Sequence, residues 1–306
     1  MLRIYLACLC ALLLAGCYQG SSDSLREDVS STGVSVEIVG NLPSDSNSAQ
    51  VAASVYFDGD RKALVGGDVV KAYSESDSAI LRSLENLSGD YTAEVPIINT
   101  AAGIHVEVEH DPVGAREDRW YPVDELLVNP GPGPLVGYNV DLAFPDPIVR
   151  DTVPANGTVF NNRSDTIDLI WAPVVSDPEQ QTRIVAVQEC FSAERSVKWA
   201  VVSVDSGDPG SYSTTVGALI PNTGAINATI NGLARIAVLV VGELLEEYTF
   251  GLVNAGNISF DSFEVEYCDI AITVFREIPG TLGPGISGGY AIASTSETFH
   301  LVFEPI

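Results

Sequence analysis

From Gly33 onward, apolar and polar residues alternate in short runs. The first run, VSVEIV (34–39), has an apolar side chain at every second position, the period of a β-strand with one buried face. Later runs of the same kind are separated by Gly, Asp, Asn and Pro, as strands are by turns. They include QVAASVYF, DYTAEVPI, GIHVEVEH, RIVAVQECF, FEVEYCDIAITVF and TFHLVFEPI. No window shows a long helical period, so the pattern predicts an all-β protein.

The strands fall into two groups. The Pro/Gly-rich segment VNPGPGP (128–134) cannot continue a central strand, and a new series of strands begins near residue 150. The lengths suit two β-sandwich domains, which we place at 34–145 and 146–306. The apolar run IAVLVV (236–241) has only six residues and predicts a buried strand rather than a membrane span.

Two segments resemble immunoglobulin-like domains. In DYTAEV, Tyr91 follows a tight Gly-Asp turn, which is similar to the tyrosine corner of that fold. The segment PANGTVFNNRSDTIDLIWAP (154–173) resembles the opening of fibronectin-III or immunoglobulin-like domains, because a turn is followed by a strand that ends in Trp-x-Pro. The resemblance implies immunoglobulin-like sandwiches, and it makes Trp171 the anchor of the second core.

The N-terminus has the pattern of an export signal. A basic start, Met1 to Arg3, precedes an apolar stretch that is too short to span a bilayer. The following LAGC (14–17) resembles a bacterial lipobox, which implies cleavage of signal peptide 1–16 and acylation of Cys17. Tyr18, in place of Asp, implies sorting to the outer membrane. The alternative is an ordinary secretory signal with an incidental cysteine.

The segment after the signal differs in composition from the rest of the chain. Residues 17–33 are rich in Ser, Asp and Gly and have no apolar period, so we expect a flexible tether between the lipid and the folded body. Two further cysteines, Cys190 and Cys268, remain in an exported chain, where disulfides persist. They predict one disulfide; two buried free thiols are the alternative.

The charge is strongly negative. The chain carries −26, and loss of the signal with its single arginine makes the mature chain −27. Such a surface repels nucleic acid and anionic lipid headgroups. Asp58, Asp60 and Asp68 crowd one hairpin region and could supply oxygen ligands for a structural calcium ion. A plain Asp-Gly hairpin turn explains the same residues.

Catalytic motifs are weak. GISGG (285–289) has the letters of a hydrolase nucleophile motif around Ser287, but only Glu297 and His300 follow it, and no strand-to-helix turn is expected there. A Gly-rich loop is the simpler interpretation. In HVEVEHD, three side chains, His105, Glu107 and Glu109, share one strand face. They could bind a transition metal or simply face solvent.

One aromatic pair stands in a polar stretch. Trp120 and Tyr121 could stack on sugar rings or anchor a protein partner; alternatively, Trp120 covers the end of the first sandwich. The sequence therefore predicts a lipid-anchored outer-membrane protein, not an enzyme, with a binding, adhesion or structural role and no resident cofactor. A surface glycan-binding module is the alternative, and an unrecognised hydrolase comes third.

Overall fold

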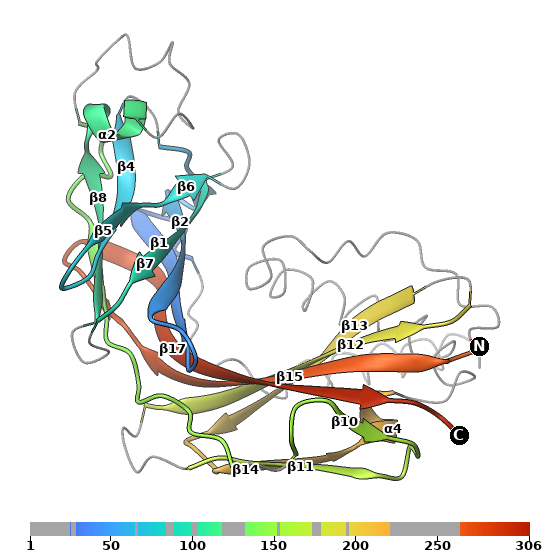
Figure 1. Cartoon of the computed structure of the whole chain (residues 1–306). Coiled ribbons are helices and arrows are strands. Elements are labelled where there is room, and N and C mark those ends of the chain that lie inside the picture. The colour runs from blue at the N-terminus through green and yellow to red at the C-terminus, as the bar shows by residue number, and fades with distance from the viewer. Residues whose placement is uncertain are drawn as a thin grey trace, which may run out of the picture.

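The protein is all-β, and its strands form two lobes (Figure 1). The computed structural model describes Leu25 and residues 29–64, 67–83, 89–98, 103–117, 132–151, 154–172, 179–193, 196–220 and 264–306. These residues include two short helices, α2 (Pro112–Glu117) and α4 (Val216–Leu219). Within these ranges, no helix has the length and apolar character needed to cross a bilayer.

The described strands form three sheets. A ten-stranded sheet has the order β13-β12-β15-β17-β1-β2-β7-β6, with β10 beside β17 and β3 beside β2. Its strands are β1 (Val34–Pro43), β2 (Ser48–Phe57), β3 (Asp60–Arg61), β6 (Arg82–Ser83), β7 (Asp90–Pro96), β10 (Thr158–Phe160), β12 (Gln181–Phe191), β13 (Ser196–Ser206), β15 (Tyr267–Pro279) and β17 (Ile286–Phe303).

Two smaller sheets complete the lobes. A five-stranded sheet, in the order β16-β9-β8-β4-β5, belongs to the first lobe, and a two-stranded sheet, β11-β14, belongs to the second. The strands are β4 (Asp68–Tyr73), β5 (Ser78–Ile80), β8 (Ile104–His110), β9 (Asn139–Leu142), β16 (Thr281–Leu282), β11 (Thr166–Ile170) and β14 (Ser211–Thr215).

The long strand β17 belongs to both lobes. Its residues 286–296 pair in parallel with β1, and its residues 292–303 pair antiparallel with β15. In Figure 1 this strand runs from the first lobe, where β1 and β2 lie, into the second, where β15 and β12 lie. The two lobes are therefore joined by continuous β-sheet and not only by a linker.

Both hydrophobic cores use the same face of β17. Ala291 and Ala293 pack in the first core, whereas Phe299, Leu301 and Phe303 pack in the second. All five positions are odd, and side chains alternate between the faces of a strand. Both smaller sheets consequently cover the same face of the ten-stranded sheet, which gives each lobe two layers.

The structure confirms the all-β sandwich class and adds one feature to the predicted domain organisation. The boundaries 34–145 and 146–306 stay a prediction, but residues from the C-terminal strands, including Ala291 and Ala293, pack in the first core. Trp171 is buried in the second core, as its position before Ala-Pro predicts.

The end of the predicted tether is held on the folded body. The Ser30 amide donates a hydrogen bond to Ser35 Oγ (3.0 Å), and the Gly33 amide donates to Asp58 Oδ1 (2.8 Å). Further upstream, Leu25 packs against a small apolar cluster. Residues of the predicted tether near its end thus contact the folded body, and the flexible character of 17–33 stays a prediction.

A buried ion pair lies where the lobes meet. The side chains of Arg276 and Asp208 are each 1 % exposed, and Arg276 Nη2 lies 2.6 Å from Asp208 Oδ2. Arg276 also donates to the backbone carbonyls of Asp146 (2.6 Å) and Ala172 (3.0 Å). Asp208 also accepts a hydrogen bond from Trp171 Nε1 (2.6 Å). One arginine thus ties β15 to three segments that are distant in the sequence.

A second buried pair lies next to the first in β15. Glu277 accepts a hydrogen bond from Arg183 Nε at 2.8 Å, and their side chains are 0 % and 3 % exposed. Gln181 Nε2 also donates to this carboxylate (3.2 Å). Because Arg276 and Glu277 are adjacent in a strand, they point to opposite faces of the sheet. Charged contacts therefore lie on both faces of the sheet at this end of β15.

The disulfide lies in the second lobe. Cys190 of β12 and Cys268 of β15 are directly opposite in the antiparallel register, with Cα atoms 3.9 Å apart and no exposed surface. This is the pair that the cysteine count predicts. The bridge links residues 78 apart, which corresponds to roughly 4 kcal/mol of stabilisation through the restricted unfolded chain.

We predict that Arg276→Ala destabilises the whole chain by about 3–5 kcal/mol, because it leaves the Asp208 carboxylate buried without its partner. Chemical denaturation monitored by intrinsic fluorescence measures the loss. Lys62→Ala is the control, since Lys62 and Asp60 form an exposed pair (39 % and 79 %) that contributes at most about 1 kcal/mol. Equal losses in the two variants would contradict the prediction.

Candidate functional site

The three aspartates proposed for calcium do not form one site. Asp58 lies in the turn between β2 and β3 and accepts the Gly33 amide; Asp60 pairs with Lys62 (3.2 Å). Asp68 lies in a different sheet, on β4, where its Oδ1 atom is 2.8 Å from His110 Nδ1. Within the described ranges, no three His, Cys, Asp or Glu side chains are arranged to hold a metal ion. The plain turn therefore explains Asp58.

Three other predicted residues lie outside the described residues. They are Cys17, Trp120 and Tyr121, so lipidation and aromatic ligand binding stay predictions. Of the predicted pairs, Cys190 and Cys268 are brought together, by the disulfide described above.

Ser287 has a packing role in this structure. Its Oγ lies 2.9 Å from the Thr32 carbonyl oxygen and 2.8 Å from that of Val34, and it can donate a hydrogen bond to either. Gly289 has φ = 86°, and a side chain there would collide with the Val36 backbone of β1. The small residues of GISGG thus allow β17 and β1 to pair closely, which explains the motif without a catalytic serine.

The polar stripe of β8 faces away from the core. Ile104, Val106 and Val108 are buried, while His105, Glu107 and Glu109 alternate with them on the outer face. Glu109 accepts a hydrogen bond from the Tyr73 hydroxyl. The polar side chains of this strand therefore face away from the core, where they pair with neighbouring side chains.

His105 lies between two carboxylates. Its Nδ1 atom is 2.7 Å from Asp141 Oδ1, and its Nε2 atom is 3.5 Å from Glu107 Oε2. Partial burial lowers the pKa of the imidazole, but the hydrogen bonds and charges of Asp141 and Glu107 outweigh it, so the net pKa is raised. The arrangement favours a charged His105 that bridges β8 and β9.

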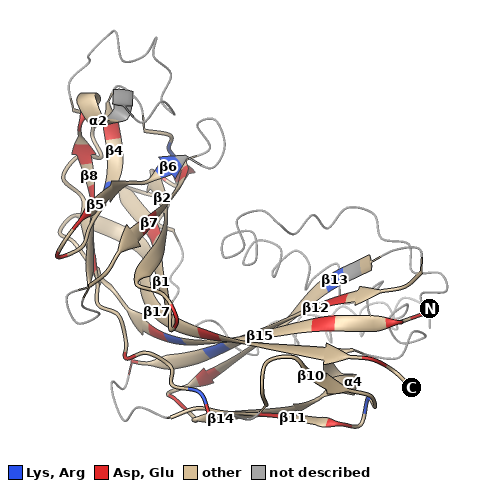
Figure 2. Cartoon of the chain, viewed as in Figure 1, with Lys and Arg blue, Asp and Glu red and all other residues tan. Residues whose placement is uncertain are grey.

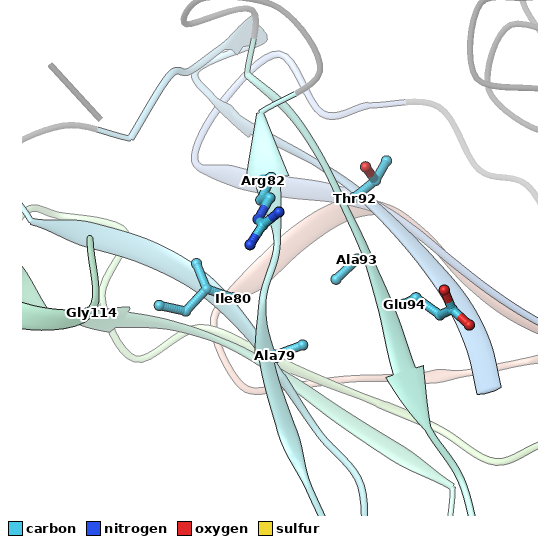
Figure 3. A pocket seen from close by; sticks show the side chains of 7 residues that line it. All are labelled: Ala79, Ile80, Arg82, Thr92, Ala93, Glu94 and Gly114. Atoms are coloured by element: carbon cyan, nitrogen blue, oxygen red, sulfur yellow. The ribbon is translucent and has the colours of Figure 1, made fainter. Parts of the chain in front are cut away.

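A groove opens on the side of the first lobe, where the edges of its two sheets face each other (Figure 3). Its volume is about 550 Å³, within the range typical of ligand sites. Its lining residues come from β5, β6, β7 and α2. They are Ala79, Ile80, Arg82, Thr92, Ala93, Glu94 and Gly114.

The chain connection between the sheets creates this groove. After β5 the chain crosses from the five-stranded to the ten-stranded sheet at Leu81, which is fully buried and whose amide donates to the Val70 carbonyl (2.9 Å). β6 pairs with β7 only at Tyr91 and Thr92. Among the described strands, residues 93–96 of β7 have a neighbour on one side only, and so does β5.

The chemistry of the groove suits an extended peptide. A sheet edge offers backbone donors and acceptors that can pair with an added strand. Ala79 and Ala93 give a small apolar floor that packs on the first core, and Arg82 and Glu94 are exposed at its sides. Sequence reasoning missed this site because alanine and threonine carry no chemical signature, and the strand pattern does not reveal which edges stay open.

No protein-family model matches the chain, and no curated protein matches it in sequence. Among solved structures, the FN1–FN3 domains of chicken CNTN1 share 7 % identity with it, at a TM-score of 0.19 over 88 % of this chain and 64 % of that one. The calcium-binding domain CBD12 of CALX1.1 shares 7 %, at a TM-score of 0.17 over 89 % of this chain and 99 % of that one. CBD12 of CALX1.2 shares 6 % at 0.17, over 82 % and 83 %.

Likenesses at these TM-scores define no family for the chain. Its class follows instead from its own sheets: an all-β, two-lobed protein whose lobes share one strand and whose first lobe has a groove between sheet edges.

We predict that His105 makes stability depend on pH. Because its pKa in the folded protein is raised above 6.5, its contribution is fully present below pH ~6.5 and is lost as pH rises through the folded-state pKa. Relative to wild type, His105→Gln should lower the Tm at pH ~5.5 and have a smaller effect at pH ~9, where the wild-type histidine is neutral. Thermal melts across this range test it, and identical pH profiles for the two proteins would contradict it. Asp141→Asn should reproduce the change.

Proposed function

We propose that this chain is a lipid-anchored cell-envelope protein with a non-catalytic binding or structural role. In this proposal, the groove between β5 and β7 receives an extended segment of an envelope protein. The observation that carries the proposal is the pair of sheet edges that face each other across a groove of about 550 Å³. Strand addition at an edge provides affinity through the backbone, and side-chain pockets provide specificity.

The anchor is Cys17, in the lipobox-like LAGC sequence. Two acyl chains or more make membrane attachment stable, since each buried methylene contributes about 0.8 kcal/mol. Leu25 packs against Val39, Tyr290 and Ile292 on β1 and β17. Seven residues lie between it and Cys17. The eight steps from one residue to the next, at up to about 3.5 Å each, span no more than about 28 Å. The anchor would therefore keep this part of the body close to the outer membrane.

Three further observations support this proposal. Ser287, in the hydrolase-like motif, is hydrogen bonded to backbone carbonyls of the segment before β1 and of β1 itself. The negative charge of the mature chain repels anionic headgroups and nucleic acid, so the body stays soluble beside the membrane. The shared strand β17 fixes the lobes to each other, which suits a platform for a partner.

The lipid anchor predicts that cells grown with a palmitate analogue label the wild-type protein and not Cys17→Ala. Acylation requires a free sulfhydryl at the cleavage site, and Cys190 and Cys268 are joined to each other. Gel fluorescence of the purified protein measures the label, and cell fractionation should show release of Cys17→Ala from the membrane. An unlabelled wild-type protein would remove the anchor from the proposal.

The groove predicts the effect of charge reversal at its sides. Crosslinking and pull-down from the native envelope should recover a partner with the wild-type protein, and Arg82→Glu together with Glu94→Arg should reduce recovery roughly tenfold. Both side chains are exposed. Glu304→Arg, at an exposed position in the second lobe, is the matched control. Full recovery by the double variant would rule out this groove.

A further inference from the structure

A second hollow lies on the second lobe, on the face of the ten-stranded sheet that faces away from the core. Its volume is about 260 Å³, and it extends across β13, β12, β15 and β17. The side chains on this face belong to the opposite set of alternating positions from the core residues Ile270, Phe299 and Leu301. This hollow shares no lining residue with the groove of the first lobe.

The strand register determines what lines the hollow. One cross-strand row contains Lys198, Glu189, Asp269 and Val302, in that order across the four strands. The next row contains Ala200, Val187, Ala271 and His300. Polar side chains therefore surround a floor of small apolar ones.

An aromatic pair adjoins this hollow. Phe191 and Tyr267 are opposite each other in the register, one row beyond Glu189 and Asp269 on the same face. Their rings are stacked, with centroids 4.6 Å apart and an interplanar angle of 14°. Tyr267 is 38 % exposed. A large ring left this open at the rim of a hollow offers a ligand an apolar surface next to polar groups.

We infer that this hollow binds a neutral glycan. The stacked rings and the apolar floor can cover the C–H face of a sugar, while carboxylates accept and an ammonium donates hydrogen bonds to its hydroxyl groups. Lys198 Nζ lies 3.8 Å from Glu189 Oε2, so these two charges offset each other. Asp269 then leaves the hollow with a negative charge, on a chain that is itself strongly acidic. Acidic glycans are repelled, and uncharged ones are accepted.

A purely structural role explains only part of the polar lining of the hollow. Lys198 and Glu189 form an ordinary exposed cross-strand pair, with side chains 41 % and 36 % exposed. That pairing does not account for the carboxylate of Asp269 and the imidazole of His300, which are both exposed in the same hollow. Their position beside the aromatic pair is what a sugar site requires.

Titration calorimetry with the full mature protein in detergent tests this inference. The probes are an N-acetylglucosamine oligosaccharide, a neutral glucan oligosaccharide and polygalacturonate. Binding of either neutral probe supports the inference, and which one binds distinguishes a cell-wall source from a capsular one. No binding of either neutral probe, or equal binding of polygalacturonate, would overturn it.

Variants of the hollow locate the site. Tyr267→Ala should weaken binding of the neutral probe roughly tenfold, and Tyr267→Phe should retain most of it. Asp269→Asn, at an exposed position, should weaken binding without affecting folding, and Glu304→Gln is the control. Unchanged binding in both Tyr267→Ala and Asp269→Asn would place the glycan elsewhere. None of these variants touches the groove between β5 and β7, so partner recovery separates the failure of one proposal from that of the other.

Discussion

The buried ion pair between Arg276 and Asp208 ties β15 of the second lobe to the segment that connects the two lobes. Removing two charges from water costs several kcal/mol for each ion, and that cost is offset only when every hydrogen bond at the site is made. Here the partners come from β15, from the loop before β14, from the segment around Asp146 and from Ala172. Asp146 lies in the segment that connects the lobes, between Phe144 of the first core and Ile148 of the second. The pair therefore fixes this connecting segment to β15 of the second lobe.

The shared strand places the two proposed binding surfaces on one continuous β-sheet. β17 pairs with β1 in the first lobe and with β15 in the second, and both cores form on the same face of its sheet. The groove between β5 and β7 is thereby held at a fixed position relative to the hollow on the second lobe. Two sites held in this way can bind one extended assembly with little loss of conformational entropy, which is the physical advantage of preorganisation.

The alternation of apolar residues predicted the all-β class, the buried Trp171 and the strands that became β1, β8 and β15. The count of cysteines left after the signal separately predicted the pair Cys190 and Cys268. The alternation could not predict that β17 pairs with β1, because a period of two identifies the faces of a strand but not its neighbours. The ion pairs of Arg276 and Glu277 could not be predicted either. In the sequence these are two polar residues at the end of an apolar run, and their partners lie far away along the chain. The candidate groove was missed because the strand pattern does not show which sheet edges stay open.

The distribution of positive charge determines which ligands the surface can accept. The chain has 15 basic residues against 41 acidic ones, and two of the arginines, Arg183 and Arg276, are almost fully buried in ion pairs at the junction. Each of them is buried together with a carboxylate, so the surface keeps the net charge of the chain, and Figure 2 shows basic residues sparsely placed on the lobes. Arg82 at the first groove and Lys198 at the second hollow are exposed exceptions. Because the surrounding field repels anions, this charge distribution favours partners that are neutral or basic overall.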